Sequence, residues 1–145
     1  MKKLLLLVVV FGLFIGCKDT IYIYSPTQKD CITLIREGEV LYIIAGKKSL
    51  DVDSNYVKIS LDKMDLADGL NVCWYDSGKY VWEVVKVNSE IIENKLDSNL
   101  YKFNTVLPID NRGIPTERKY RKEGCATILL NSKQCSPPSE LLIEW

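Results

Sequence analysis

The reactive side chains of this 145-residue chain are cysteines: the sequence holds five cysteines and no histidine. Without histidine there is no Ser–His or Cys–His nucleophile pair and no histidine metal site. No G-x-S-x-G, G-x-G-x-x-G, phosphate-loop or H-E-x-x-H motif occurs, and no pair of acidic residues stands out. We therefore expect a protein that is not an enzyme and needs no cofactor, with carboxylate-only chemistry as the one catalytic option left open.

Cys17 ends a segment with the layout of a bacterial lipoprotein signal peptide. Two lysines precede an apolar run at residues 4–15, which is shorter than the roughly 20 residues of a membrane-spanning helix. Residues 13–16 resemble a lipobox, with the small Gly16 before the cysteine, although Phe14 stands where leucine is usual. The resemblance implies cleavage after Gly16, a diacylglyceryl group on the Cys17 sulfur and an acyl group on its amine. Several acyl chains, at about 0.8 kcal/mol per buried methylene group, hold a protein stably on a bilayer.

The residue after Cys17 is Lys18, whereas an aspartate there favours inner-membrane retention in enterobacterial lipoproteins. The resemblance therefore implies an outer-membrane anchor with the domain facing the periplasm. Residues 17–20 form a short tether, because three residues span only about 10 Å. The alternative is a plain secretory signal peptide followed by an unrelated cysteine.

The mature chain has the size of one domain and almost no net charge. Removing residues 1–16 leaves 145 − 16 = 129 residues, enough to bury about two-thirds of the unfolded surface. Two lysines leave with the signal peptide, so 17 basic residues face 19 acidic ones and the formal charge is −2. We expect a single domain at residues 21–145 and no nucleic acid partner, because nucleic acid binding needs a basic surface.

Four cysteines remain after Cys17, and in an exported domain they predict two disulfides with three pairings open. The favoured pairing is Cys31–Cys73 with Cys125–Cys135, because the second pair is local and the first two cysteines each lie in a strand-like segment. A zinc site is the alternative; the absence of a C-x-x-C spacing and the export of the chain argue against it. We therefore predict no bound metal.

The mature chain alternates β-branched or aromatic residues with polar ones, as β-strands do. We predict strands at residues 21–24, 31–35, 40–45, 56–61, 70–75, 79–87, 126–130 and 141–145. Residues 36–39 are a predicted hairpin turn, and Gly78 suits a three-residue hairpin loop at 76–78. Residues 89–104 fit either two short strands or a helical turn.

This pattern predicts an all-β fold: a single antiparallel β-sandwich or a small barrel, stapled by disulfides. The sandwich would be immunoglobulin-like without the standard topology, since Trp74 directly follows Cys73 and no Tyr-x-Cys corner occurs. Trp74 and Trp82 lie in mid-strand and are predicted core residues, with an exposed aromatic binding surface as the alternative. Residues 51–55 begin like a calcium loop but lack its glycine and glutamate, so they are predicted to be a turn.

The long loop at residues 109–124 is the candidate binding surface, because long connections in compact domains are often functional. It contains five basic and three acidic residues. It could grip an acidic protein or a phospholipid headgroup, and the alternative is a solvated surface loop. The candidate partner-binding residues are Arg112, Arg118, Lys119, Arg121 and Lys122.

The whole layout resembles a group of short enterobacterial-type lipoproteins described as type VI secretion immunity proteins. The similar features are the lipobox ending at Cys17, the cysteine in residues 30–34, and the segments 71–74 and 79–82. The similarity runs to about Val87 and fades after it. It implies a periplasmic antitoxin that binds a toxin from a neighbouring or sister cell, and it carries over no catalytic residue. The alternatives are an inhibitor of host lysozyme-like enzymes and an envelope assembly lipoprotein.

Overall fold

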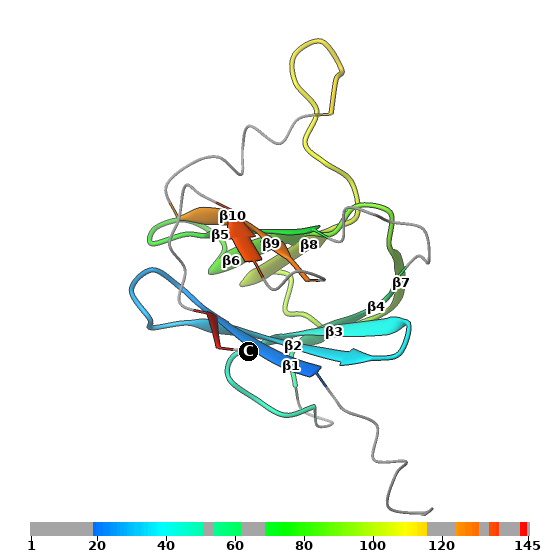
Figure 1. Ribbon diagram of the computed structural model, residues 1–145. Coiled ribbons are helices and arrows are strands. Elements are labelled where there is room, and N and C mark those ends of the chain that lie inside the picture. Colours follow the sequence, from blue (N-terminus) through cyan, green and yellow to red (C-terminus); the bar gives the residue numbers. More distant parts are fainter. Residues whose placement is uncertain are drawn as a thin grey trace, which may run out of the picture.

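Two β-sheets packed face to face make up the protein, as the computed structural model shows (Figure 1). The structure describes residues 19–50, 54–61, 69–115, 124–130, 134–136 and 143–144, and these residues form eleven strands and no helix. The described strands form two separate open sheets and no closed barrel. The predicted all-β sandwich is therefore confirmed, and the barrel alternative is excluded.

The first sheet has six antiparallel strands in the order β11-β1-β2-β3-β4-β7. Their bounds are Asp19–Tyr24 (β1), Cys31–Glu37 (β2), Val40–Ala45 (β3), Tyr56–Ser60 (β4), Glu90–Asn94 (β7) and Ile143–Glu144 (β11). The second sheet has five strands in the order β10-β9-β5-β6-β8. Their bounds are Gly69–Trp74 (β5), Trp82–Val85 (β6), Tyr101–Asn104 (β8), Cys125–Leu129 (β9) and Gln134–Ser136 (β10). The predicted strands recur, most of them with shifted ends, and the ambiguous segment 89–104 holds two strands. Residues 141–142 and 145 of the last predicted strand, and residues 51–53 of the predicted turn, lie outside the described residues.

One strand pair differs from the predicted antiparallel arrangement. After β6 the chain crosses to the first sheet as β7 and then returns as β8, which lies parallel to β6. A parallel neighbour requires such a crossover, whereas a tight turn can give only an antiparallel one. The crossover makes β8 an edge strand of the second sheet, and the chain leaves the sandwich directly after it.

The hairpin between β5 and β6 is wider than the predicted three-residue loop at 76–78. Trp74 pairs with Trp82, so residues 75–81 form the loop, which the Tyr75 N–H closes by donating to the Val81 carbonyl at 3.1 Å. The Val81 N–H donates away from this hairpin, to the Leu100 carbonyl at 2.7 Å. The predicted strand at 79–87 therefore begins only at residue 82.

The core lies between the two sheets and is built from alternate residues of their strands. Its fully buried side chains include Ile23, Leu34, Ile43, Val57, Val72, Val84 and Ile128. Trp74 and Trp82 are also buried in this core, which confirms their predicted place. The indole N–H groups of both tryptophans lack a hydrogen-bond partner among the described residues. Such groups are rare in folded proteins and call for an explanation.

The disulfide of the structure joins Cys73 on β5 to Cys125 on β9, at directly opposed positions of the second sheet. The favoured pairing of Cys31 with Cys73 and of Cys125 with Cys135 is therefore wrong. Cys31 begins β2 in the other sheet and is a buried free thiol. Cys135 lies opposite Ile128 in the β9–β10 ladder, not opposite Cys125, and its side chain is outside the described set.

Candidate functional site

Residues 105–115 leave β8 and project well beyond the body of the sandwich (Figure 1), and we call this segment the finger. Three large apolar side chains of the finger are exposed: Val106 by 73%, Ile109 by 66% and Ile114 by 50%. Single exposed apolar residues are ordinary, whereas three on one short projection form a surface that a partner could cover. The finger is therefore the convex candidate contact surface of the described chain.

The tip of the finger is held by the carboxylate of Asp110. One oxygen accepts the backbone N–H groups of Arg112 at 2.8 Å and Ile114 at 3.0 Å. The other accepts the Arg112 side chain, from Nε at 3.1 Å and from Nη2 at 2.9 Å. These bonds, the Ile114 N–H first and the Arg112 guanidinium next, lower the pKa of Asp110.

The backbone of the finger closes the same turn. The Asp110 N–H donates to the Ile114 carbonyl at 2.9 Å, and the Gly113 N–H donates to the Asp110 carbonyl at 2.9 Å. Gly113 has a φ of +78°, a left-handed conformation that suits glycine. Ile109 and Pro115 form a β-bridge at the base of this turn. The tip is thus ordered before any partner arrives, which reduces the entropy lost on binding.

The root of the finger is fixed to the second sheet through Asn104, the last residue of β8. Its carbonyl accepts the Lys86 N–H at 3.1 Å, and its side-chain amide donates to Glu83 at 3.1 Å. Glu83 is only 2% exposed and also accepts the Tyr75 hydroxyl at 2.7 Å and the Lys102 ammonium at 3.2 Å. A buried carboxylate is tolerated only with such partners, so this cluster ties the finger to β6.

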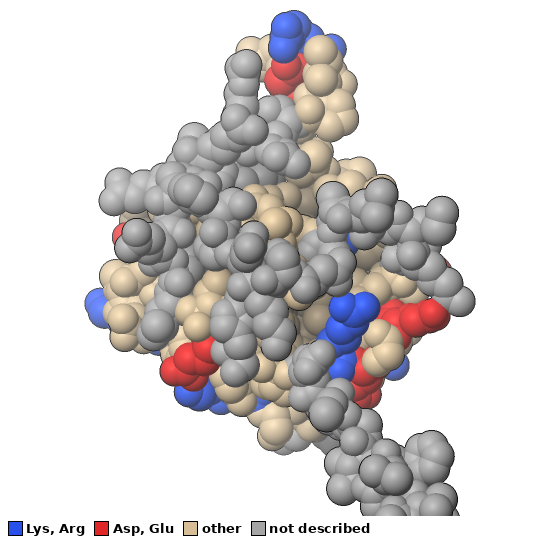
Figure 2. All heavy atoms as spheres, in the orientation of Figure 1, with Lys and Arg blue, Asp and Glu red and all other residues tan. Residues whose placement is uncertain are grey.

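Arg112 places an exposed, positively charged guanidinium at the tip of the finger. Its side chain is 71% exposed, and its Nη1 hydrogens make no bond with a described residue. Figure 2 shows a mostly uncharged projection with a basic group at its end and an acidic group beneath it. A guanidinium flanked by exposed isoleucines suits a concave partner site with apolar walls and a carboxylate or carbonyl inside.

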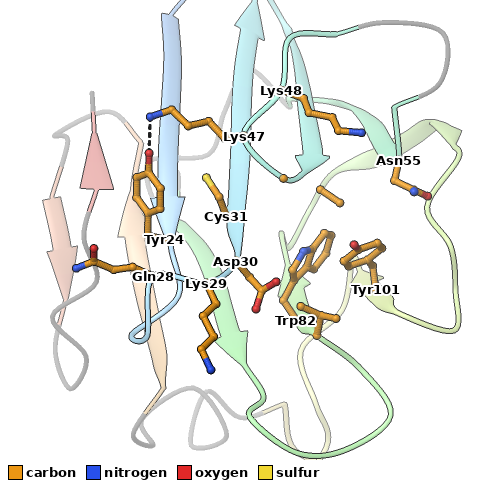
Figure 3. A pocket seen from close by; sticks show the side chains of 13 residues that line it. Tyr24, Gln28, Lys29, Asp30, Cys31, Lys47, Lys48, Asn55, Trp82 and Tyr101 are labelled. Atoms are coloured by element: carbon orange, nitrogen blue, oxygen red, sulfur yellow. Dashed lines mark hydrogen bonds between the residues drawn. The ribbon is translucent and has the colours of Figure 1, made fainter.

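A pocket of about 390 Å³ is the concave candidate site. It lies where the β1–β2 turn and the β3–β4 connection meet the starts of β6 and β8 (Figure 3). One wall is aromatic: the rings of Trp82 and Tyr101 lie 4.9 Å apart at 33°. The Asp30 carboxylate sits beside this wall. Burial, and then the negative charges of Asp30 and Asp97, raise the pKa of Tyr101.

The outer rim of the pocket is closed by a three-residue network. The Lys47 ammonium donates to the Tyr24 hydroxyl at 2.6 Å and to Glu144 at 2.8 Å, and the Tyr24 hydroxyl donates to Glu144 at 2.9 Å. These bonds raise the pKa of Lys47, chiefly through Glu144, and lower the pKa of Glu144, chiefly through Lys47. Burial raises the pKa of the neighbouring Cys31 thiol to about 11. The Lys47 ammonium is thus already paired with Tyr24 and Glu144, and Cys31 stays a protonated, poorly nucleophilic thiol.

The structure describes one of the five predicted partner-binding residues, and Arg112 lies at the tip of the finger. The other four, Arg118, Lys119, Arg121 and Lys122, lie outside the described residues, as does Cys17. Sequence analysis missed the exposed apolar residues Val106, Ile109 and Ile114, and the ordering role of Asp110. The spacing of Asp110 and Gly113, typical of a tight turn, was the available indication.

Two further properties concern only the part of the chain that the structure describes. Within it, no three His, Cys, Asp or Glu side chains gather in a way that could hold a metal ion. The same residues include no helix of the length and apolar character needed to cross a membrane.

Comparison of the chain with protein-family models, with curated proteins and with solved structures finds no significant match.

Proposed function

We propose that the protein is a lipid-anchored periplasmic binding protein that neutralises a toxin delivered by a contact-dependent, type VI secretion system. The observation that carries the binding part of this proposal is the finger. It is ordered by its own hydrogen bonds, exposes Val106, Ile109 and Ile114, and carries an accessible guanidinium at Arg112. Such a projection can enter the active-site cleft of another protein and block it.

The anchor in this proposal is Cys17, which would carry the acyl chains that keep the domain at the periplasmic face of the outer membrane. A Cys17→Ser variant, which lacks the sulfur that is acylated, should appear in the soluble periplasmic fraction. The unchanged chain should remain with the outer membrane after cell fractionation. Equal membrane retention of the two proteins would contradict the anchor.

The test of the antitoxin role is a survival assay in which a strain lacking the gene competes with a toxin-delivering sister strain. We expect the deletion to reduce survival and the unchanged gene to restore it. Ile109→Asp places a charge on the apolar surface of the finger and should fail to restore survival. Ser77→Asp introduces the same charge in the exposed loop between β5 and β6 and is the matched control. A deletion strain as resistant as its parent would refute the proposal.

A second candidate is inhibition of a host lysozyme-like enzyme. The position of Arg112 favours it, because a guanidinium at the end of a narrow projection suits an acidic catalytic cleft. Titration of purified lysozymes with the protein should then slow hydrolysis, and Arg112→Glu should abolish the effect. Full activity of every lysozyme tested would exclude this function and leave the antitoxin role.

A further inference from the structure

The outer face of the first sheet, on the side away from the second sheet, is lined by tyrosines. Residues of β1, β3 and β4 that alternate with core residues point to this face. They include Tyr22, Tyr24, Tyr42 and Tyr56, of which Tyr56 is buried and the other three are half-buried. The hydroxyl groups of Tyr22 and Tyr42 make no hydrogen bond with a described residue, so they can bond to a polar surface outside the protein.

A lysine ammonium lies over each of these four tyrosine rings. The distances from Nζ to the ring centre are 4.8 Å for Lys47 and Tyr22, 5.3 Å for Lys47 and Tyr24, 5.4 Å for Lys58 and Tyr42, and 5.3 Å for Lys95 and Tyr56. Lys47 and Lys95 are also paired with glutamates, whereas Lys58 forms no ion pair with a described residue. Lysine and tyrosine are both amphipathic, and such side chains are favoured where water meets the headgroups of a membrane.

The connection between β3 and β4 lies on the same face and adds a further lysine to it. Leu50 packs against the outward-facing cluster that contains Ile44. The Thr33 hydroxyl donates to the Gly46 carbonyl at 2.6 Å and accepts the Lys48 N–H at 3.3 Å. Figure 1 shows this connection on the side of the first sheet that faces away from the second sheet. The Lys48 side chain is exposed there and forms no ion pair with a described residue.

The position of β1 brings this face close to the anchor. β1 begins at Asp19, two residues after Cys17, so an acylated Cys17 would hold the start of β1 within about 10 Å of the bilayer. The finger leaves the other sheet, and Figure 1 shows it projecting away from the first sheet. A domain that rests on the outer face of its first sheet would therefore point the finger away from the membrane.

The other surface beside the start of β1 is the turn between β2 and β3, because Asp19 pairs with Arg36. This turn contains the acidic residues Glu37 and Glu39. The phosphates of lipid headgroups repel carboxylates and attract ammonium groups. Lys48 and Lys58 on the outer face of the sheet thus make that face the better match to the bilayer.

We propose that the outer face of the first sheet rests on the membrane that holds the anchor, with Lys48 and Lys58 at the headgroup phosphates and Tyr22 and Tyr42 among the headgroups. This inference rests on the Cys17 anchor of the proposed function and is independent of the antitoxin role. It gives the domain one orientation, in which the finger is presented to partners in the periplasm.

The test places the mature lipidated chain, labelled with ¹⁵N, in nanodiscs of phosphatidylethanolamine and phosphatidylglycerol. A gadolinium-chelating lipid in the nanodisc attenuates the NMR signals of amides close to the headgroups. We expect strong attenuation at Tyr22 and Tyr42 and little at Ile109 and Ile114. Equal attenuation at the two regions, or stronger attenuation at the finger, would overturn this orientation alone. A chain that separates from the nanodiscs during gel filtration would instead refute the anchor, and the orientation with it.

Two variants complete the test. Lys58→Gln removes one ammonium from the proposed contact and should lower the ratio of resting to detached domains by about fivefold, seen as weaker attenuation at Tyr42. Lys79→Gln is the matched control, because Lys79 also lies over a tyrosine ring, that of Tyr80 at 5.1 Å, but in the β5–β6 loop of the other sheet. Unchanged attenuation in Lys58→Gln, or an equal decrease in Lys79→Gln, would overturn the proposal.

Discussion

The finger and the pocket present opposite chemistry to the surroundings of the protein. In the finger the polar groups of Asp110, Arg112 and Ile114 bond to one another, and the apolar side chains point outward. In the pocket the aromatic rings of Trp82 and Tyr101 form a wall, and exposed polar side chains such as those of Asp30 and Lys48 also line the cavity. A convex surface of the first kind recognises a partner by shape and apolar contact, and a concave one of the second kind by hydrogen bonds.

The two regions also owe their order to different parts of the molecule. The tip of the finger is ordered by hydrogen bonds within residues 109–115, and only its root depends on the second sheet. The pocket is assembled from residues 28–31 of the β1–β2 turn, residues 45–48 with Asn55, and the starts of β6 and β8. Disturbing the sandwich should therefore damage the pocket first, and disturbing Asp110 should damage only the finger.

The largest effect should follow removal of the disulfide between Cys73 and Cys125, which are 52 residues apart. The double variant Cys73→Ala/Cys125→Ala should lose about 4 kcal/mol of unfolding free energy, because the unfolded chain is no longer restrained by a cross-link. Urea denaturation measures the loss. Cys31→Ala removes a buried thiol but no cross-link, and it should cost clearly less. Equal stability of the double variant and the unchanged chain would show that this cross-link does not hold the second sheet together.

A smaller loss of unfolding free energy should follow the substitution Glu83→Gln at the root of the finger. The neutral amide loses the ion pair with Lys102, and its NH₂ group would face the donors of Lys102 or Asn104. We expect a loss of about 2 kcal/mol in unfolding free energy, measured by thermal denaturation. Amide hydrogen exchange should also accelerate at residues 104–106. Unchanged exchange there would mean that Glu83 does not fix the finger to the sheet.

Asp110→Ala should separate the finger from the rest of the protein. The exposed tip loses four hydrogen bonds, so partner affinity should fall by about tenfold or more, which isothermal titration calorimetry would measure. The melting temperature should hardly change, because the substitution touches no core residue. A large fall in melting temperature would contradict the view that the finger orders itself.

The mildest change is a fall in pH. The folded pKa of Asp110 lies below its ordinary value of 3.8, so the ionised carboxylate stabilises the tip at every pH above that value. This contribution should disappear as the pH falls below 3.8 and through the folded pKa. The amide resonances of Arg112 and Ile114 should then move toward random-coil positions, while those of the sandwich core stay in place. Arg112 and Ile114 amide resonances that stay unchanged down to pH 2 would contradict this role of the Asp110 carboxylate.

Much of the sandwich could be predicted because alternation of apolar and polar residues is a local property. This alternation predicted the ends of strands β1 to β5 to within a few residues of those in the structure. The disulfide could not be predicted, because Cys73 and Cys125 meet through the register of two strands distant in sequence. Sequence spacing favoured the local pair of Cys125 with Cys135 and misled the assignment.

The candidate sites show the same division between local and non-local information. Arg112 was identified from the sequence because a run of charged residues is visible there. Ile109 and Ile114 were not, because an isoleucine in a loop gives no sign of whether the fold will cover it. The pocket was beyond sequence analysis altogether, since Asp30, Asn55 and Tyr101 come from three separate segments.

The most direct test of the central claim, that the finger is the contact surface, is a hydrogen-exchange footprint. The mature chain would be compared alone and in complex with the product of the toxin gene expected beside its own gene. We predict a stoichiometric complex in which amide exchange slows at residues 105–115. Exchange at β7, another exposed part of the chain, should not change. Protection of β7 with an unaffected finger, or the absence of any complex, would contradict the account.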